Sequence, residues 1–113
     1  MSTIPNENIC GLKREDFQTT INGKRTDLYV LRNALGNEVA ITNYGGAIVA
    51  IMVPDRDGKY ANIIQGHDNI NDVINSPEPY LSRLIGRFGN RIAKGKFQLH
   101  GKEYCLPINN GPN

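Results

Sequence analysis

Ten consecutive residues, Gly86-Arg87-Phe88-Gly89-Asn90-Arg91-Ile92-Ala93-Lys94-Gly95, contain the side chains whose types and spacing most suggest a binding site. Three glycines allow positive φ angles and a close approach of backbone to ligand. Arginine supplies forked hydrogen-bond donors and asparagine supplies both donors and an acceptor, which suits an oxygen-rich ligand. A strand-like run, 96–99, follows at once. The pattern therefore predicts a polar binding loop at the end of a sheet.

Two other functions of this loop are disfavoured by its sequence. A phosphate loop would end in Gly-Lys-Ser/Thr and follow directly on an apolar strand, and neither feature is present. An RNA-binding surface would need more aromatic side chains than Phe88 alone. A solvated surface loop without function remains the alternative at this point.

The composition indicates one small folded domain. The chain has 113 residues, of which 39% are hydrophobic and 21% charged, so it is not of a disordered type. A net charge of +2 is too small to suggest nucleic acid or an acidic membrane as a partner. No apolar run is long enough to span a bilayer, and polar residues rather than a signal sequence follow Met1. We therefore expect a cytoplasmic protein, or a periplasmic one if a signal was removed.

The cysteine and histidine residues predict neither a disulfide nor a metal site. Cys10 and Cys105 are the two cysteines, and we expect both to be free, with Cys105 buried or half-buried in a strand. His67 and Asp68 are adjacent, so their side chains alternate and do not form a metal-binding pair. The charged stretch 55–59 lacks the spacing of a calcium loop and is expected to be a turn.

Alternation and turn signals predict a series of short strands. The pair Asn22-Gly23 favours a type I′ turn. Paired glycines after Tyr44 suggest a bulge or a sharp corner. The expected elements are a hairpin of 17–21 with 24–31, strands at 38–43, 47–53 and 60–65, a helical turn at 71–75, and a hairpin of 96–99 with 102–106 around His100-Gly101. This spacing is typical of an all-β sandwich or barrel, in which an exposed edge strand would favour self-association.

Four stretches of the chain resemble the aldose 1-epimerase (galactose mutarotase) family between Phe17 and Asn113. The most specific is 86–95, and the others are Asn43-Tyr44-Gly45-Gly46-Ala47, Val53-Pro54-Asp55 with Gly58, and Leu106-Pro107-Ile108-Asn109-Asn110-Gly111-Pro112-Asn113. The sequence departs from the family at 81–84, where Leu-Ser-Arg-Leu replaces residues that are often smaller.

The resemblance implies a fold and a domain organisation. The fold would be all-β, the amino-terminal part of a large antiparallel β-sandwich of the galactose mutarotase-like supersandwich type. Residues 1–15 would form a polar amino-terminal tail, and residues 16–113 the first part of one sandwich domain truncated at its carboxyl end.

The resemblance also implies an enzyme and its substrate. Family members interconvert the α and β anomers of free aldoses such as galactose and glucose, with a Glu as base, a His as acid, and no metal or cofactor. By motif, Asn90 and Arg91 correspond to residues that bind sugar hydroxyls. The catalytic Glu and His would lie beyond residue 113, since His67 and His100 do not match them, so this chain would contain no catalytic residue and be inactive alone.

Partners other than an aldose are not expected, apart from a homo-oligomer formed through exposed strand edges. The alternative function is a non-catalytic carbohydrate-binding or self-associating β-module.

Overall fold

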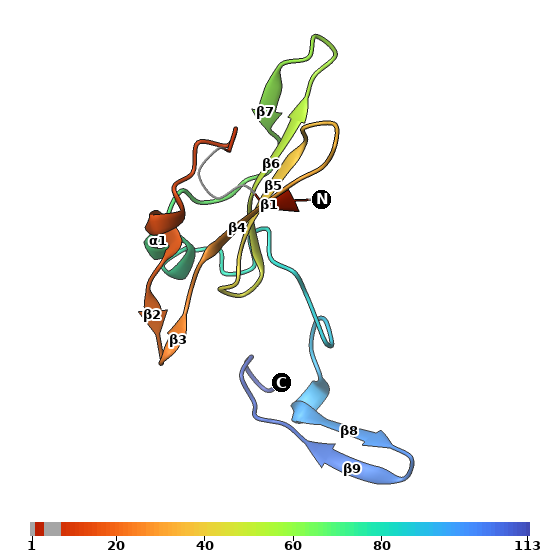
Figure 1. Cartoon of the computed structure of the whole chain (residues 1–113). Helices are drawn as coiled ribbons and strands as arrows, with labels where there is room; N and C mark the ends of the chain where they lie inside the picture. Colours follow the sequence, from red (N-terminus) through yellow and green to blue (C-terminus); the bar gives the residue numbers. More distant parts are fainter. Residues whose placement is uncertain (1, 4–7) are drawn as a thin grey trace.

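The computed structural model describes residues 2–3 and 8–113, and it consists mainly of antiparallel strands (Figure 1). The main sheet has the order β1-β4-β5-β6-β7, with every neighbouring pair antiparallel. Its strands are β1 (Ser2–Thr3), β4 (Leu28–Arg32), β5 (Glu38–Thr42), β6 (Ala47–Pro54) and β7 (Tyr60–Asn62). Two-stranded sheets are formed by β2 (Thr20–Ile21) with β3 (Lys24–Arg25) and by β8 (Lys96–Leu99) with β9 (Lys102–Cys105). The expected all-β fold is confirmed.

The two central strands follow the predicted patterns. In β5 the side chains of Glu38, Ala40 and Thr42 are buried and those between them are less so, as alternation requires. The apolar run of β6 is largely buried. Between the strands, Gly45 and Gly46 have φ angles of +64° and +60°, which glycine adopts without steric cost. The paired glycines therefore form the predicted sharp corner.

Short helical segments cover one face of this sheet. They are the 3-10 helix η1 (Arg14–Phe17) and the helix α1 (Ile70–Ile74), which contact each other and lie on the same side of β4 in Figure 1. The predicted helical turn is thus confirmed within one residue. The buried apolar residues of this core are Phe17, Leu28, Val30, Ala40, Ala47, Val49, Ala50, Ile70 and Val73.

The amino-terminal hairpin is shorter than the sequence suggested. The turn at Asn22-Gly23 forms with positive φ at both residues, but the paired strands are no longer than Thr20–Ile21 and Lys24–Arg25, followed by one backbone hydrogen bond of 2.8 Å from the Thr26 amide to the Thr19 carbonyl. Phe17 is not in a strand: it ends η1 with a fully buried side chain, and its carbonyl accepts a hydrogen bond from Thr26 Oγ1 at 2.7 Å. The prediction of strand 17–21 is therefore wrong at its start, because burial of one aromatic ring outweighs continued pairing.

A buried carboxylate connects the segment 8–10 to the sheet. Glu38 is 1% exposed and accepts hydrogen bonds from the backbone amides of Ile9 and Cys10 and from Arg32 Nη2. Burial alone would raise the pKa of Glu38, but the Ile9 amide and the Arg32 guanidinium lower it below its usual value. Of the segment expected as a polar tail, residues 1 and 4–7 lie outside the described residues, while Ser2–Thr3 pairs with β4.

The hairpin β8–β9 projects away from the main sheet (Figure 1), and every residue in both strands is exposed. Its register pairs Phe97 with Tyr104, as predicted, and their rings stack with centroids 5.2 Å apart. Cys105 is free and exposed, so the prediction that it is buried is wrong, because no other described segment covers either face of the hairpin. Cys10 is also free, as expected.

Candidate functional site

The loop 86–95 leaves the sheet and leads to the projecting hairpin, and it holds Asn90 and Arg91 side by side. Asn90 has a φ angle of +67°, a left-handed conformation that asparagine tolerates better than most residues. Its side-chain oxygen Oδ1 accepts a hydrogen bond of 3.3 Å from Arg91 Nη1. The two residues that the sequence selected therefore form one polar unit.

The hairpin brings a second polar segment back to this loop. The amide of Leu106, just after β9, donates to the Gly95 carbonyl at 2.7 Å. Gly95 is buried with a φ angle of +63°, and a Cβ there would lie 2.8 Å from the Leu106 carbonyl oxygen, so only glycine fits. The segment 109–113 then closes a tight turn in which Asn113 donates to the carbonyl of Asn110 at 2.9 Å.

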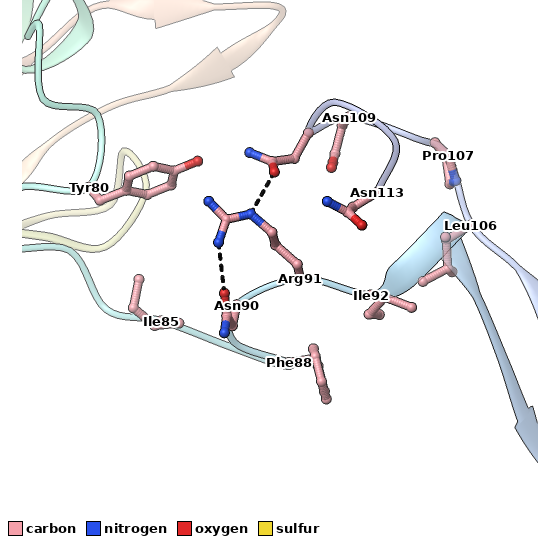
Figure 2. Close-up of a pocket in the computed structure, with 12 residues that line it drawn as sticks. Tyr80, Ile85, Phe88, Asn90, Arg91, Ile92, Leu106, Pro107, Asn109 and Asn113 are labelled. Carbon is pink, nitrogen blue, oxygen red and sulfur yellow. Dashed lines mark hydrogen bonds between the residues drawn. The ribbon is translucent and has the colours of Figure 1, made fainter.

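Arg91 joins the two segments, as Figure 2 shows. Its Nε donates to Asn110 Oδ1 at 2.8 Å, while Nη1 points to Asn90. Among the described residues nothing accepts a hydrogen bond from Arg91 Nη2, so this corner of the guanidinium is available to a ligand oxygen.

An open hollow of about 820 Å³ lies between the two segments, within the usual size range of small-molecule sites. Its polar side chains are the amides of four asparagines, the Arg91 guanidinium and the Tyr80 hydroxyl, and aliphatic and aromatic groups fill the remaining wall. The lining residues are Tyr80, Ile85, Phe88, Asn90, Arg91, Ile92, Gly95, Leu106, Pro107, Asn109, Asn110 and Asn113.

The groups that line this hollow suit hydrogen bonding to oxygen atoms. Amides and a guanidinium offer several donors and acceptors to hydroxyl groups. No carboxylate or imidazole is among the described residues that line it. His67 and His100 lie elsewhere, the latter with a φ angle of +51° in the β8–β9 turn, as predicted. Within residues 2–3 and 8–113 no cluster of three potential metal ligands occurs.

The carboxyl groups with shifted pKa values belong to the sheet rather than to the hollow. The Arg14 guanidinium lowers the pKa of Asp27 to about 2, through paired hydrogen bonds of 2.8 and 2.7 Å. At the other end of the sheet Glu38 has a lowered pKa. Both carboxylates therefore stabilise the folded state, and neither is among the residues that line the hollow.

The resemblance selected Asn90 and Arg91, which both line the hollow, but the sequence assigned no role to Tyr80 or Asn110. Asn110 lies nineteen residues from Arg91 and reaches it only because the hairpin reverses the chain. The asparagine-rich run 109–113 was a usable signal, because several amides close together favour contact with oxygen-rich ligands.

The fold and the hollow together define an all-β protein that presents amide and guanidinium groups to a ligand. The family model of aldose 1-epimerase matches residues 27–113, which include the whole loop and the turn behind it. The chain therefore belongs to the aldose 1-epimerase family. The sequence resemblance is confirmed.

Curated relatives agree with this assignment. The chain is 45% identical over 75 residues to galactose mutarotase of Bos taurus and 41% identical over 75 residues to that of Homo sapiens, each alignment covering 66% of this chain. It is 39% identical over 69 residues to a probable aldose 1-epimerase of Arthroderma benhamiae, covering 58% of this chain and 16% of the relative. The chain spans about a fifth of the length of the mammalian relatives, since 22% of each is matched.

Proposed function

We propose that this chain is the amino-terminal part of an aldose 1-epimerase, an isomerase that interconverts the α and β anomers of free aldoses such as galactose and glucose. Membership of the aldose 1-epimerase family supports the reaction class. The names of the relatives in Bos taurus and Homo sapiens support galactose as a substrate.

The observation that carries this proposal is the arrangement of Arg91 in the hollow. Two of its nitrogens are fixed by Asn110 and Asn90, and Nη2 remains open toward the cavity side. A guanidinium held in this way binds an oxygen atom without further ordering, which strengthens binding. The neighbouring amides of Asn90 and Asn109 suit the hydroxyl groups of a sugar.

In the proposed reaction Asn90 and Arg91 bind and orient the sugar. When the ring opens, negative charge develops on the oxygen that receives a proton, and a positioned guanidinium stabilises that charge. The proton transfers themselves need an acid and a base, and none of the described residues that line the hollow carries a carboxylate or imidazole side chain. We assign both to residues outside 1–113, and the proposed reaction uses no metal or cofactor.

Polarimetry tests the reaction. The optical rotation of freshly dissolved α-galactose is recorded until it reaches equilibrium, once with this chain and once with the full-length protein that the proposal implies (the uninterrupted gene product), at equal concentrations. The proposal predicts that the gene product accelerates the change and that residues 1–113 alone do not. A gene product without effect on galactose and glucose would contradict the proposed function.

A second candidate is a self-associating β-module, and the exposed hairpin favours it. Phe97, Leu99 and Tyr104 present apolar surface on β8–β9, with exposed fractions of 40%, 51% and 37%. Such surface often marks an interaction site. Sedimentation at several concentrations distinguishes this candidate: a mass that rises with concentration supports it, and a constant monomeric mass contradicts it.

A further inference from the structure

Arg83 contacts α1, the corner between β5 and β6, and the start of β6. Its Nη2 donates to the Val73 carbonyl at 3.0 Å, in the last turn of α1, where a carbonyl lacks a helical partner. Its guanidinium carbon lies 5.6 Å from the centroid of the Tyr44 ring, in cation–π geometry. Its backbone forms an antiparallel bridge with Ala47 at the start of β6.

The corner between β5 and β6 accommodates this guanidinium. A Cβ atom at Gly45 would lie 2.5 Å from Arg83 Nη1, so the cation occupies the space that a side chain there would fill. Tyr44 thus provides an aromatic ring, and Gly45 leaves space because it has no side chain. The Arg83 side chain contacts the ring and occupies that space. Arg83 itself is only partly exposed.

The segment 80–85 is held on both sides of Arg83. The Ile48 amide donates to the Ser82 carbonyl at 2.8 Å, and the Leu84 amide donates to the Gly46 carbonyl at 3.1 Å. Ser82 Oγ donates to the Gln65 carbonyl at 2.6 Å. The bonds of Arg83 therefore complete a junction between the sheet, α1 and this segment.

The same segment forms one wall of the hollow and then becomes the loop 86–95. The Arg83 amide donates to the Tyr80 carbonyl at 3.4 Å, which closes the turn that carries Tyr80. Figure 2 shows the Tyr80 hydroxyl directed toward the side of the hollow where Arg91 lies. Loss of the Arg83 contacts would therefore displace Tyr80, which lies three residues earlier in the chain. It would also displace Asn90, through the loop 86–95.

We propose that Arg83 is a positioning residue for the sugar site: held between Tyr44 and the end of α1, it fixes segment 80–85 and so sets Tyr80 opposite Arg91. This inference rests on the proposed function, because its first readout is the Michaelis constant for galactose. Among the described residues that line the hollow, Arg83 forms a hydrogen bond only with Tyr80, through the backbone, so a change at Arg83 acts on sugar binding more than on proton transfer.

The test compares Arg83→Met with Arg83→Lys in the uninterrupted gene product. Methionine keeps an apolar stem and removes both the cation and the donor, whereas lysine keeps a charge and one donor. We expect R83M to raise KM for galactose about tenfold while kcat changes less than about threefold, and R83K to recover part of the loss. Arg56→Met, in the exposed turn between β6 and β7, is the matched control and leaves KM unchanged.

A second readout uses backbone amide NMR signals of residues 80–91 in the 113-residue chain. R83M is expected to move or broaden them while those of β4 and β5 stay in place. If R83M does not fold, Tyr44→Leu removes the ring and keeps the bond to Val73, and a smaller rise in KM is expected.

The outcomes separate this inference from the proposed function. A KM for R83M equal to that of R56M overturns the positioning role. If the unmodified gene product does not accelerate mutarotation, the proposed function fails, and the NMR signals alone decide the role of Arg83. In that case unchanged signals for 80–91 overturn it, and changed signals in 80–91 alone support it.

Discussion

At the scale of single residues, the polar groups of this chain divide into those that stabilise the fold and those that we propose bind a ligand. Asp27 belongs to the first group: it binds Arg14 through two oxygens and accepts from Gln18 and from the Leu28 amide. Arg91 belongs to the second group. Its two fixed nitrogens leave a third directed away from protein acceptors.

Asp27 makes stability dependent on pH in the acid range. Its pKa is lowered from 3.8 to about 2, mainly by the Arg14 hydrogen bonds, so the folded state prefers the ionised form. The stabilisation is complete above pH 3.8 and is lost as the pH falls through about 2. We predict that the thermal midpoint, measured by circular dichroism, falls less steeply across this range in Asp27→Asn than in the unmodified chain.

Asp57→Asn is the control for the pH experiment, because Asp57 is exposed and its side chain forms no ion pair within the described part of the chain. Its acid dependence should match that of the unmodified chain. Equal slopes for D27N and the unmodified chain would show that the Arg14 pair does not stabilise the folded state.

At the scale of elements, the strands could be predicted wherever their residues carry the pattern of their surroundings. Strand β6 has an apolar sequence and is largely buried. Strand β5 alternates in burial as expected, although its buried face carries Glu38, Ala40 and Thr42. The start of the first hairpin could not be predicted, because the position of Phe17 depends on core residues distant in sequence, such as Val73. Local propensity does not contain that information.

The candidate site was predictable only in part. The composition of the loop 86–95 marked it as a candidate binding loop, and the resemblance to the aldose 1-epimerase family selected Asn90 and Arg91 within it. The contact of Arg91 with Asn110 depends on the length and register of β8–β9, which bring the two together. The role of Arg83 depends on Tyr44 and Val73, which no sequence spacing relates to it.

A single glycine tests the packing between elements. Gly66 lies against β6, where an added Cβ would be 2.4 Å from the Val49 carbonyl oxygen, a backbone atom that does not move freely. We predict that Gly66→Ala lowers the free energy of unfolding by about 1–3 kcal/mol, measured by urea denaturation.

Gly58→Ala provides the comparison, since a Cβ at Gly58 meets nothing within 4 Å although φ is +80°. The loss of unfolding free energy in Gly58→Ala should come from the backbone conformation alone and stay at about 1 kcal/mol. If Gly66→Ala is as stable as the unmodified chain, the close approach of Gly66 to Val49 is contradicted.

At the scale of the whole molecule, the chain has a packed part and a projecting part. Its radius of gyration is 17.8 Å and its longest extent 55 Å, against a radius of about 13 Å for a compact domain of similar size. The core is formed by residues from 17 to 73, and the hollow lies outside it, between residues 80–95 and the segment 106–113 that follows the hairpin. No described helix is long and apolar enough to cross a membrane.

The two parts should differ in stability. Phe97→Ala on the exposed hairpin is expected to change the free energy of unfolding of the sheet by less than about 0.5 kcal/mol. Phe17→Ala in the core should cost about 3–5 kcal/mol. Amide hydrogen exchange at Ala40 and Ala50 measures both changes in the central strands. Equal losses of unfolding free energy in Phe97→Ala and Phe17→Ala would contradict the division into a packed part and a projecting part.

The central claim, that Asn90 and Arg91 bind the sugar, is tested most directly by the rate of galactose mutarotation in variants of the uninterrupted gene product. Arg91→Lys keeps the charge but loses the fork that reaches Asn110 and Asn90 together. Asn90→Gly keeps the left-handed backbone and removes only the amide. Arg56→Lys is the matched control. We predict that R91K and N90G lower kcat/KM at least about tenfold while R56K leaves it unchanged. Full activity in R91K and N90G would contradict the account.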